Sequence, residues 1–378
     1  MDLERWKRAF PDKSSTPALY THGLLVGCLE VVTIADAGED GWIPVFSRVT
    51  HLEVNSFSGD PHRPTAAFLI PFHGLSPSLK RLRILSDTLS NSQILHFVSS
   101  LPHLEDLSVA SSGSDNEAPG SDGSLTVAQP RPSHPFTGTL ELAITRGMDT
   151  MTRWLLGQPN GLHFRNLVVS WINEDDLQLI NALVGGCTDT LESFSAVETL
   201  PVAYYLSVAP VLFLCPTCCS SSFVDEREPV PIDLSGATKL RDASFLVSSL
   251  GVGWITRALQ TTTHNHRDFR PISFAMSDIN SLSLVDVGQA TRDPVFSQWF
   301  ELDRLLVQFW DTRSIRLKIT YYAPGERWEK MDGLAKGLLP EMAMRGLIDA
   351  EGPSKDGHFW CNFPPVFPSN GQIISSNY

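Results

Sequence analysis

The residues best suited to chemistry in this chain are the cysteines of a short cluster, Cys215–Cys219, which reads CPTCC. Two thiolates separated by two residues form half of a tetrahedral zinc site. The nearest further ligands of finger type, His264 and His266, lie more than 40 residues downstream. We therefore expect no metal and no cofactor, and we interpret 264–266 as a solvated polar turn before the next strand.

A run of three carboxylates, Glu174–Asp176, also has a simpler explanation than metal binding. It follows Asn173 and precedes Leu177, Ile180 and Val184, whose spacing predicts one apolar face of a helix. The helix dipole favours acidic side chains in the first turn. The chain also has no G-x-S-x-G, Walker, G-x-G-x-x-G or H-E-x-x-H pattern. We expect a protein that is not an enzyme.

The elements that would position any site follow from a pattern that recurs eight times: an apolar residue, two variable ones, an apolar, one variable, an apolar. With a shortened ninth copy at 139–144, the middle apolar residues are 25 to 35 positions apart, except for one step of 49. This period is typical of a solenoid, and the pattern is that of the strand in a leucine-rich repeat. The eight copies are Val49–Val54, Leu79–Ile84, Leu104–Val109, Phe164–Val169, Leu191–Ala196, Leu240–Phe245, Phe269–Phe274 and Leu302–Val307.

Segments between these copies have helical periodicity. We expect helices after Ser90, around 148–155, after Asn173 and around 255–259, and a last one from about Glu329 to Arg345 with a kink at Pro340. The predicted fold class is α/β: an irregular leucine-rich-repeat-like solenoid of strand–loop–helix units stacked into a curved array.

The predicted organisation has three parts: a helical N-terminal lead-in or cap at 1–45, a solenoid at 46–350 and a C-terminal tail at 351–378. Residues 110–135 are rich in Ser, Gly, Asp and Pro, which predicts a disordered loop. The segment 202–226 lies in the long step, and its removal would shorten that step to 24 residues. Its codons would be mostly pyrimidine-rich, so it is either a retained intron or a genuine loop.

Bulk composition limits the classes of partner. The chain has 378 residues and a net charge of −13, with 42% hydrophobic and 19% charged residues. This composition is globular, and the charge argues against binding to a phosphate backbone. The long apolar run, Val202–Cys215, has 14 residues, whereas a bilayer-spanning helix needs about 20. Cys28, Cys187 and Cys361 lie beside apolar residues and are interpreted as core thiols. We expect an intracellular soluble protein, cytoplasmic or nuclear, with no nucleic acid or membrane partner.

The alternation of a β-strand predicts where a recognition surface would lie. If the apolar positions point into the solenoid, the residues beside the middle one point outward on the concave face. Their mixed charge favours a protein ligand, and the alternative is a solvated face with no partner. The predicted protein-binding residues are His51, Glu53, Arg81, Arg83, Asp106, Ser108, Asn166, Val168, Arg304 and Leu306.

Several stretches carry a more specific resemblance: 6–12 (WKRAFPD), 46–52 (FSRVTHL), 79–82 (LKRL), 97–107 (FVSSLPHLEDL) and 232–240 (IDLSGATKL). They resemble basidiomycete fungal F-box proteins with degenerate leucine-rich repeats. That resemblance implies a cullin ubiquitin ligase subunit, in which an F-box binds the Skp adaptor and the repeats select the protein substrate.

The chain departs from this family at the F-box. Only about 45 residues precede the first repeat, and they contain no Leu-Pro-rich opening. We expect an F-box to be encoded upstream of Met1 or to have been lost. The leading prediction is the substrate-binding repeat region of an F-box-type ligase subunit. The alternative is a stand-alone interaction or scaffold protein with no ubiquitin role.

Overall fold

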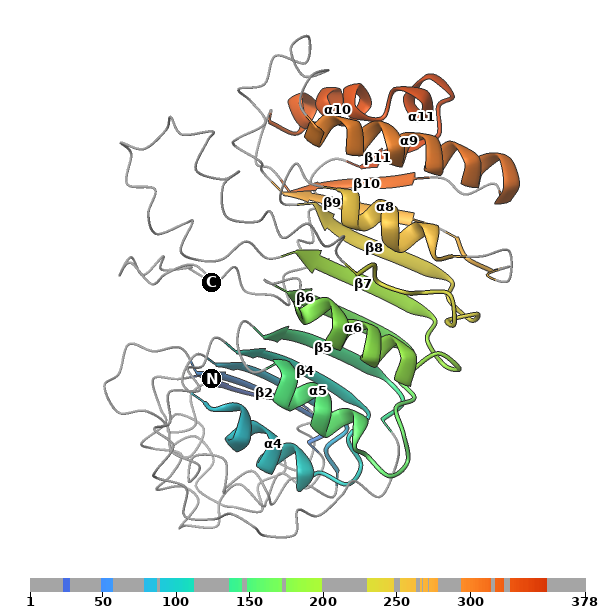
Figure 1. Cartoon of the computed structure of the whole chain (residues 1–378). Coiled ribbons are helices and arrows are strands. Elements are labelled where there is room, and N and C mark those ends of the chain that lie inside the picture. Colours follow the sequence, from blue (N-terminus) through green and yellow to red (C-terminus); the bar gives the residue numbers. More distant parts are fainter. Residues whose placement is uncertain are drawn as a thin grey trace.

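The protein contains one parallel β-sheet whose strands lie in chain order (Figure 1). The computed structural model describes residues 23–27, 49–56, 78–86, 89–111, 136–144, 148–171, 175–198, 230–247, 252–262, 266, 268–270, 272–277, 294–313, 317–322 and 327–351. Within these residues the eleven strands are β1 (Gly23–Gly27), β2 (His51–Ser56), β3 (Arg81–Ser86), β4 (Asp106–Ser111), β5 (Thr139–Ile144), β6 (Asn166–Trp171), β7 (Ser193–Glu198), β8 (Asp242–Val247), β9 (Ile272–Ser277), β10 (Leu317–Tyr322) and β11 (Ile348–Glu351).

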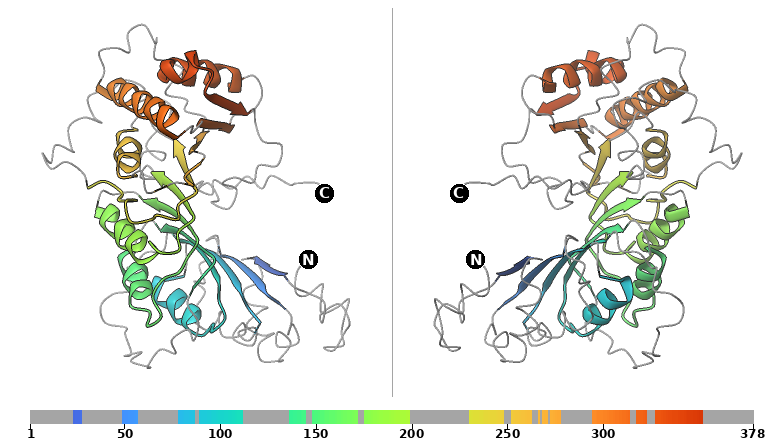
Figure 2. Two further views of the ribbon diagram at one scale, coloured as in Figure 1. Left: turned by 90° about the vertical axis from the view of Figure 1, so that its right-hand side faces the viewer. Right: turned by 90° about the vertical axis from the view of Figure 1, so that its left-hand side faces the viewer.

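The described helices lie on one face and at one end of this sheet. Figure 2 shows α4, α5, α6, α8 and α9 along one face, while α10 and α11 lie beside α9 at the β10–β11 end. The stack curves so that the face without helices is concave. The helices are α4 (Asn91–Ser99), α5 (Met148–Leu156), α6 (Asp175–Gly186), α8 (Gly253–Gln260), α9 (Pro294–Arg313), α10 (Arg327–Leu338) and α11 (Pro340–Met344).

The strands form where the recurring pattern predicts them, and the register shows why. The middle apolar residues align across neighbouring strands, as in Leu52 opposite Leu82 and Leu82 opposite Leu107. From β2 to β10 each such residue is at most 2% exposed and faces the helices, as does the residue two positions later. Because every unit buries the same positions against its neighbours, the core is continuous from β2 to β10. The α/β fold class is confirmed.

The predicted helices are also confirmed. α4 begins after Ser90, whose hydroxyl accepts from the Gln93 amide at 3.3 Å while the Gln93 side chain accepts from the Ser90 amide at 2.9 Å. This reciprocal capping box satisfies two amides at the start of the helix. The last predicted helix is divided into α10 and α11, and Pro340 is the first residue of α11, where its missing N–H is not needed.

One predicted strand is wrong. Leu302–Val307 lies inside α9, a helix of 20 residues. The apolar spacing of the strand pattern, i, i+3 and i+5, overlaps with the i, i+3, i+4 spacing of a helix. In α9 the buried side chains are Trp299, Leu302, Asp303, Leu306, Val307 and Phe309, which is helical periodicity.

The pattern did not predict three of the described strands, β1, β10 and β11. By register, Leu24, Leu317 and Ile348 are their middle apolar residues. Three positions earlier, where each full copy of the pattern has an apolar residue, the sequence has Thr21, Ser314 and Arg345. β1 also corrects the prediction of a helical lead-in or cap at 1–45, because Gly23–Gly27 is a strand that extends the sheet.

The sheet is continuous across the segment 199–229, which lies outside the described residues. β7 pairs directly with β8. On the helix side, the side chain of Asn181 on α6 bridges to the chain before β8. Its Nδ2 donates to the Pro231 carbonyl, and its Oδ1 accepts from the backbone N–H of Asp233, both at 2.7 Å. The predictions for 202–226 and 352–378, for most of the loop 110–135 and for a helix at 1–12 also lie outside the described residues. At its start, the predicted loop overlaps β4, which continues to Ser111.

Among the described helices, none has both the length and the apolar character needed to cross a bilayer.

Candidate protein-binding face

The concave face of the sheet is formed by alternate residues of each strand. We number these positions from the first residue of β2 and carry them along the register, so that positions two and four point to the helices. Positions one, three and five then point to the open face. The predicted binding residues on β2, β3, β4 and β6 occupy positions one and three of this face.

The remaining two predicted binding residues, Arg304 and Leu306, are not on this face. Both lie in α9, where Arg304 is exposed and Leu306 is 1% exposed in the core. The prediction was wrong because it depended on a strand at 302–307. The open face instead includes residues that the prediction omitted, from β5, β7 and β8. The positional rule that gave His51 and Glu53 also gives them: Thr139, Glu141, Ser193, Ser195, Asp242 and Ser244.

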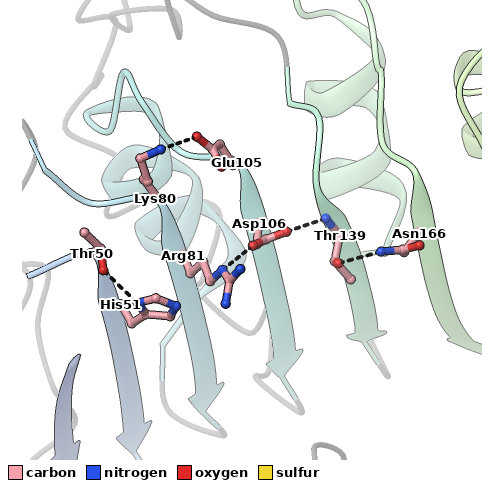
Figure 3. Close-up of polar contacts among 8 residues, drawn as sticks. All are labelled: Thr50, His51, Lys80, Arg81, Glu105, Asp106, Thr139 and Asn166. Carbon is pink, nitrogen blue, oxygen red and sulfur yellow. Dashed lines mark hydrogen bonds and ion pairs between the residues drawn. The ribbon is translucent and has the colours of Figure 1, made fainter. Parts of the chain in front are cut away.

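A ladder of polar side chains occupies position one (Figure 3). Arg81 Nε lies 2.7 Å from Asp106 Oδ2, and the other Asp106 oxygen accepts from the Thr139 amide at 2.6 Å. The ladder continues where the Asn166 amide nitrogen donates to the Thr139 hydroxyl at 3.2 Å. These bonds link β3 to β6. Arg81 is held by its charged partner Asp106, and Asp106 and Thr139 are each held by partners on both neighbouring strands.

Further charges flank this ladder on β2, β3 and β4. Arg83 Nη1 lies 3.4 Å from Glu53 Oε1 at position three. Just before the strands, Lys80 Nζ lies 2.8 Å from Glu105 Oε1. Ion pairs exposed to this extent stabilise a fold by about 1 kcal/mol or less. Their main effect here is to give the β2–β5 part of the open face a fixed pattern of alternating charge.

Gly138 permits the central contact of the ladder. A Cβ at this position would lie 1.9 Å from Asp106 Oδ1 and 3.0 Å from the Glu105 carbonyl oxygen. The Asp106 carboxylate can therefore reach the Thr139 amide only because residue 138 has no side chain. Sequence reasoning missed Gly138, since its role depends on a carboxylate 32 positions earlier in the chain.

We predict that Gly138→Ala displaces the Asp106 carboxylate and lowers the free energy of unfolding by about 1.5–3 kcal/mol, the range for a lost charged hydrogen bond. The measurement is urea unfolding followed by circular dichroism. Gly185→Ala in α6 is the control, because a Cβ there meets nothing within 4 Å. In an Asp106→Ala background the cost of Gly138→Ala should shrink. An equal cost in both backgrounds would show that Asp106 is not the cause.

The open face changes character toward β6–β9. At positions three and five it presents Val168, Ser195, Val197, Ser244 and Ala275, none of which is charged. At position one, the Ser193 hydroxyl donates to Asp242 Oδ1 at 2.6 Å. Burial raises the pKa of Asp242 above its ordinary value, and this hydrogen bond partly opposes the rise. At position three the face is thus charged on β2, β3 and β5 and uncharged over β6–β9, where the charges lie at the amino ends of the strands: Asp242 at position one, and Arg241 Nη1 3.5 Å from Glu192 Oε2 just before β8 and β7.

Metal chemistry finds no support in the described residues. They contain no cluster of three or more His, Cys, Asp or Glu side chains that could hold a metal ion. His266, predicted to lie in a solvated turn, is 1% exposed, and its Nε2 lies 2.9 Å from the Leu234 carbonyl oxygen. That prediction was wrong because the ring packs beside Phe269 in the core. Cys215–Cys219 lies outside the described residues.

The described thiol, Cys187, is a core residue as predicted. It is 1% exposed, and burial raises its pKa to about 11. A thiol with so high a pKa is protonated at neutral pH and is a poor nucleophile.

No protein-family model matches the chain, and no curated protein matches it significantly. The fold and the open face are therefore the basis for a functional proposal.

Proposed function

We propose that this protein is a non-catalytic protein-recognition module that binds its partner on the open face of a leucine-rich-repeat-like solenoid. The observation that carries the proposal is the ladder from Arg81 to Asn166, a fixed row of charged and polar groups on a face that no described helix covers. Polar groups held in place by their neighbours lose little conformational entropy when a partner binds. The mixed charge suits a protein better than a polyanion.

The sequence resemblance supports a more specific role within this proposal. It is the substrate-binding repeat region of an F-box-type ubiquitin ligase subunit, with a protein as substrate. The contact with the Skp adaptor and cullin would come from an F-box outside the present sequence. The alternative, a stand-alone interaction or scaffold protein, would use the same face without any ubiquitin machinery.

Two arginines provide a matched test of the open face. Arg81 Nε and Arg153 Nε each lie 2.7 Å from one aspartate oxygen, and both side chains are well exposed, at 61% and 78%. Arg81 lies on the open face, whereas Arg153 lies on α5. Arg81→Ala and Arg153→Ala should therefore have similarly small effects on stability, and they differ in the surface that they change.

We expect proteins that co-purify with the tagged natural protein to be reduced at least about 10-fold by Arg81→Ala and to be unchanged by Arg153→Ala, as measured by quantitative mass spectrometry. A 10-fold change is the loss of about 1.4 kcal/mol of binding free energy. Recovery of the same proteins in the same amounts with both variants would contradict binding at this face. Recovery of a Skp adaptor with the natural protein would favour the ligase role, and its absence from a partner-bound sample would favour the scaffold alternative.

A further inference from the structure

Glu141 is a carboxylate of the open face that the sheet buries without pairing it. It occupies position three of β5 and is 9% exposed. Among the described residues, none makes a hydrogen bond or an ion pair with its side chain. Its carboxylate oxygens are not among the fully enclosed side-chain atoms of the described residues that lack a partner. Because acidic side chains buried to this extent are almost always paired, Glu141 indicates a place for a cation that arrives from the open face.

The sheet itself does not need a carboxylate at this position. The residues opposite Glu141 on the neighbouring strands are Ser108 and Val168. On β7, β8 and β9 the same position is occupied by serine. Small neutral side chains therefore suit position three of this sheet, whereas removing a carboxylate from water without a partner costs free energy. Packing does not account for the charge of Glu141, and a role in binding does.

The cations on the same part of the face are already neutralised. Arg81 lies 2.7 Å from Asp106, and Arg83 lies 3.4 Å from Glu53. Arg83 belongs to β3, two strands from Glu141, so their Cα atoms are roughly 10 Å apart. Among the described residues at positions one, three and five of β2–β7, these four formal charges cancel. The charge that remains is the negative charge of Glu141.

The surroundings of Glu141 suit a lysine or arginine side chain. Val168 lies opposite it on β6, and Ala143 is the next residue of β5 on the same face. Both are partly buried apolar residues, on which the aliphatic stem of a basic side chain can pack. On the other side, the hydroxyl of Ser108 can accept a further hydrogen bond from the cationic head. A close charge pair in such a partly enclosed site contributes measurably to affinity.

We propose that Glu141 anchors a lysine or arginine side chain of the protein partner, so that the segment bound on the open face is basic at this point. The inference rests on the proposed function, because it names the chemistry that the partner presents to the same face. The net charge of −13 favours the approach of a basic partner.

The test uses the full chain in three forms: unchanged, Glu141→Gln and Glu301→Gln. Both substitutions remove one negative charge and keep the shape of the side chain. Glu301 is exposed on α9, on the side of the sheet that carries the helices (Figure 2), so it is the matched control. We expect the urea midpoint of Glu141→Gln to equal or exceed that of the unchanged chain, because the lost charge has no described partner. A clearly lower midpoint would show a structural role for the carboxylate and overturn the inference.

Each form is then used to select from a random peptide library displayed on phage. We expect the unchanged chain and Glu301→Gln to select peptides that share a lysine or arginine. Replacement of that residue by glutamine in a synthetic peptide should weaken binding to the unchanged chain at least about 10-fold, as for other close charge pairs. The same replacement should change binding to Glu141→Gln by less than about two-fold, because the two groups then no longer interact.

Three results would overturn the anchor: selection of no peptide, selection of peptides without a shared basic residue, and a basic residue whose replacement costs as much with Glu141→Gln as with the unchanged chain. Failure of the proposed function is a different result. It requires that Arg81→Ala leave the co-purified proteins unchanged, so recognition at the open face can stand while the anchor at Glu141 fails.

Discussion

Phe245→Ala is expected to lower the free energy of unfolding by about 3–5 kcal/mol, the range for removal of a fully buried phenylalanine. Phe245 is 0% exposed at position four of β8. Its ring lies edge-on to those of Trp254 on α8 and Phe274 on β9, with centroids 5.6 and 6.1 Å away, and to Phe194 on β7 at 6.5 Å. Alanine would leave a cavity among three aromatic rings that belong to three different elements.

The measurement is urea unfolding of the full chain, followed by near-UV and far-UV circular dichroism. Phe300→Ala on α9 is the matched control, because that ring is 38% exposed, and surface substitutions usually change stability by about 0.5 kcal/mol or less. A loss of stability for Phe245→Ala no larger than that of the control would show that the fold does not depend on the packing of this ring against β7, α8 and β9.

Asp303→Ala is expected to lower the free energy of unfolding by about 2 kcal/mol, because it removes the cap of α11. Asp303 is 2% exposed, and its carboxylate accepts from the Glu341 amide at 2.8 Å and from the Met342 amide at 3.0 Å. Without it, two amides at the start of a helix, that of Glu341 partly buried and that of Met342 buried, lose their acceptor. Asp311→Ala on the same helix is the control, since Asp311 makes an exposed ion pair with Arg345.

We expect the hydrogen bonds of Asp303 to contribute more to stability than its charge. Burial raises the pKa of this carboxyl, although the two amides partly oppose the rise. Asp303→Asn, which keeps one acceptor, should therefore recover a large part of the loss. Because the folded-state pKa lies above the unfolded value, the stability of the wild type relative to this variant should fall as pH rises through the raised pKa. A relative stability that instead rises over this interval would contradict the assignment.

The parts of the fold that could be predicted are those in which the same strand pattern recurs from one unit to the next. Leu82 and Ile84 identify β3 because each unit must bury the same two positions against the next. The pattern failed where the same spacing also suits a helix, as at Leu302 and Leu305, and where a polar residue such as Ser314 replaces the first apolar one. Local spacing alone does not distinguish these cases.

The candidate site was predictable in outline only. Alternation along a strand places His51, Arg81 and Asp106 on one face, and register then aligns them. The closeness of Gly138 to Asp106 depends on how two loops meet at the amino ends of their strands. No pattern within either segment indicates that meeting. The cap that Asp303 gives to α11 is likewise a contact between helices, and an acidic residue on an apolar helix face was its only signal in the sequence.

The agreement between chain order and sheet order also affects how the protein is made. During synthesis each strand can pair with the one that left the ribosome just before it, so no strand waits for a partner from a distant part of the chain. Among β2–β9, the longest stretch of chain between consecutive strands is the 43 residues 199–241, between β7 and β8. At about 5–20 residues per second this interval lasts roughly 2–9 s. For that time the edge of β7 is unpaired, and the nascent protein is most open to wrong partners there.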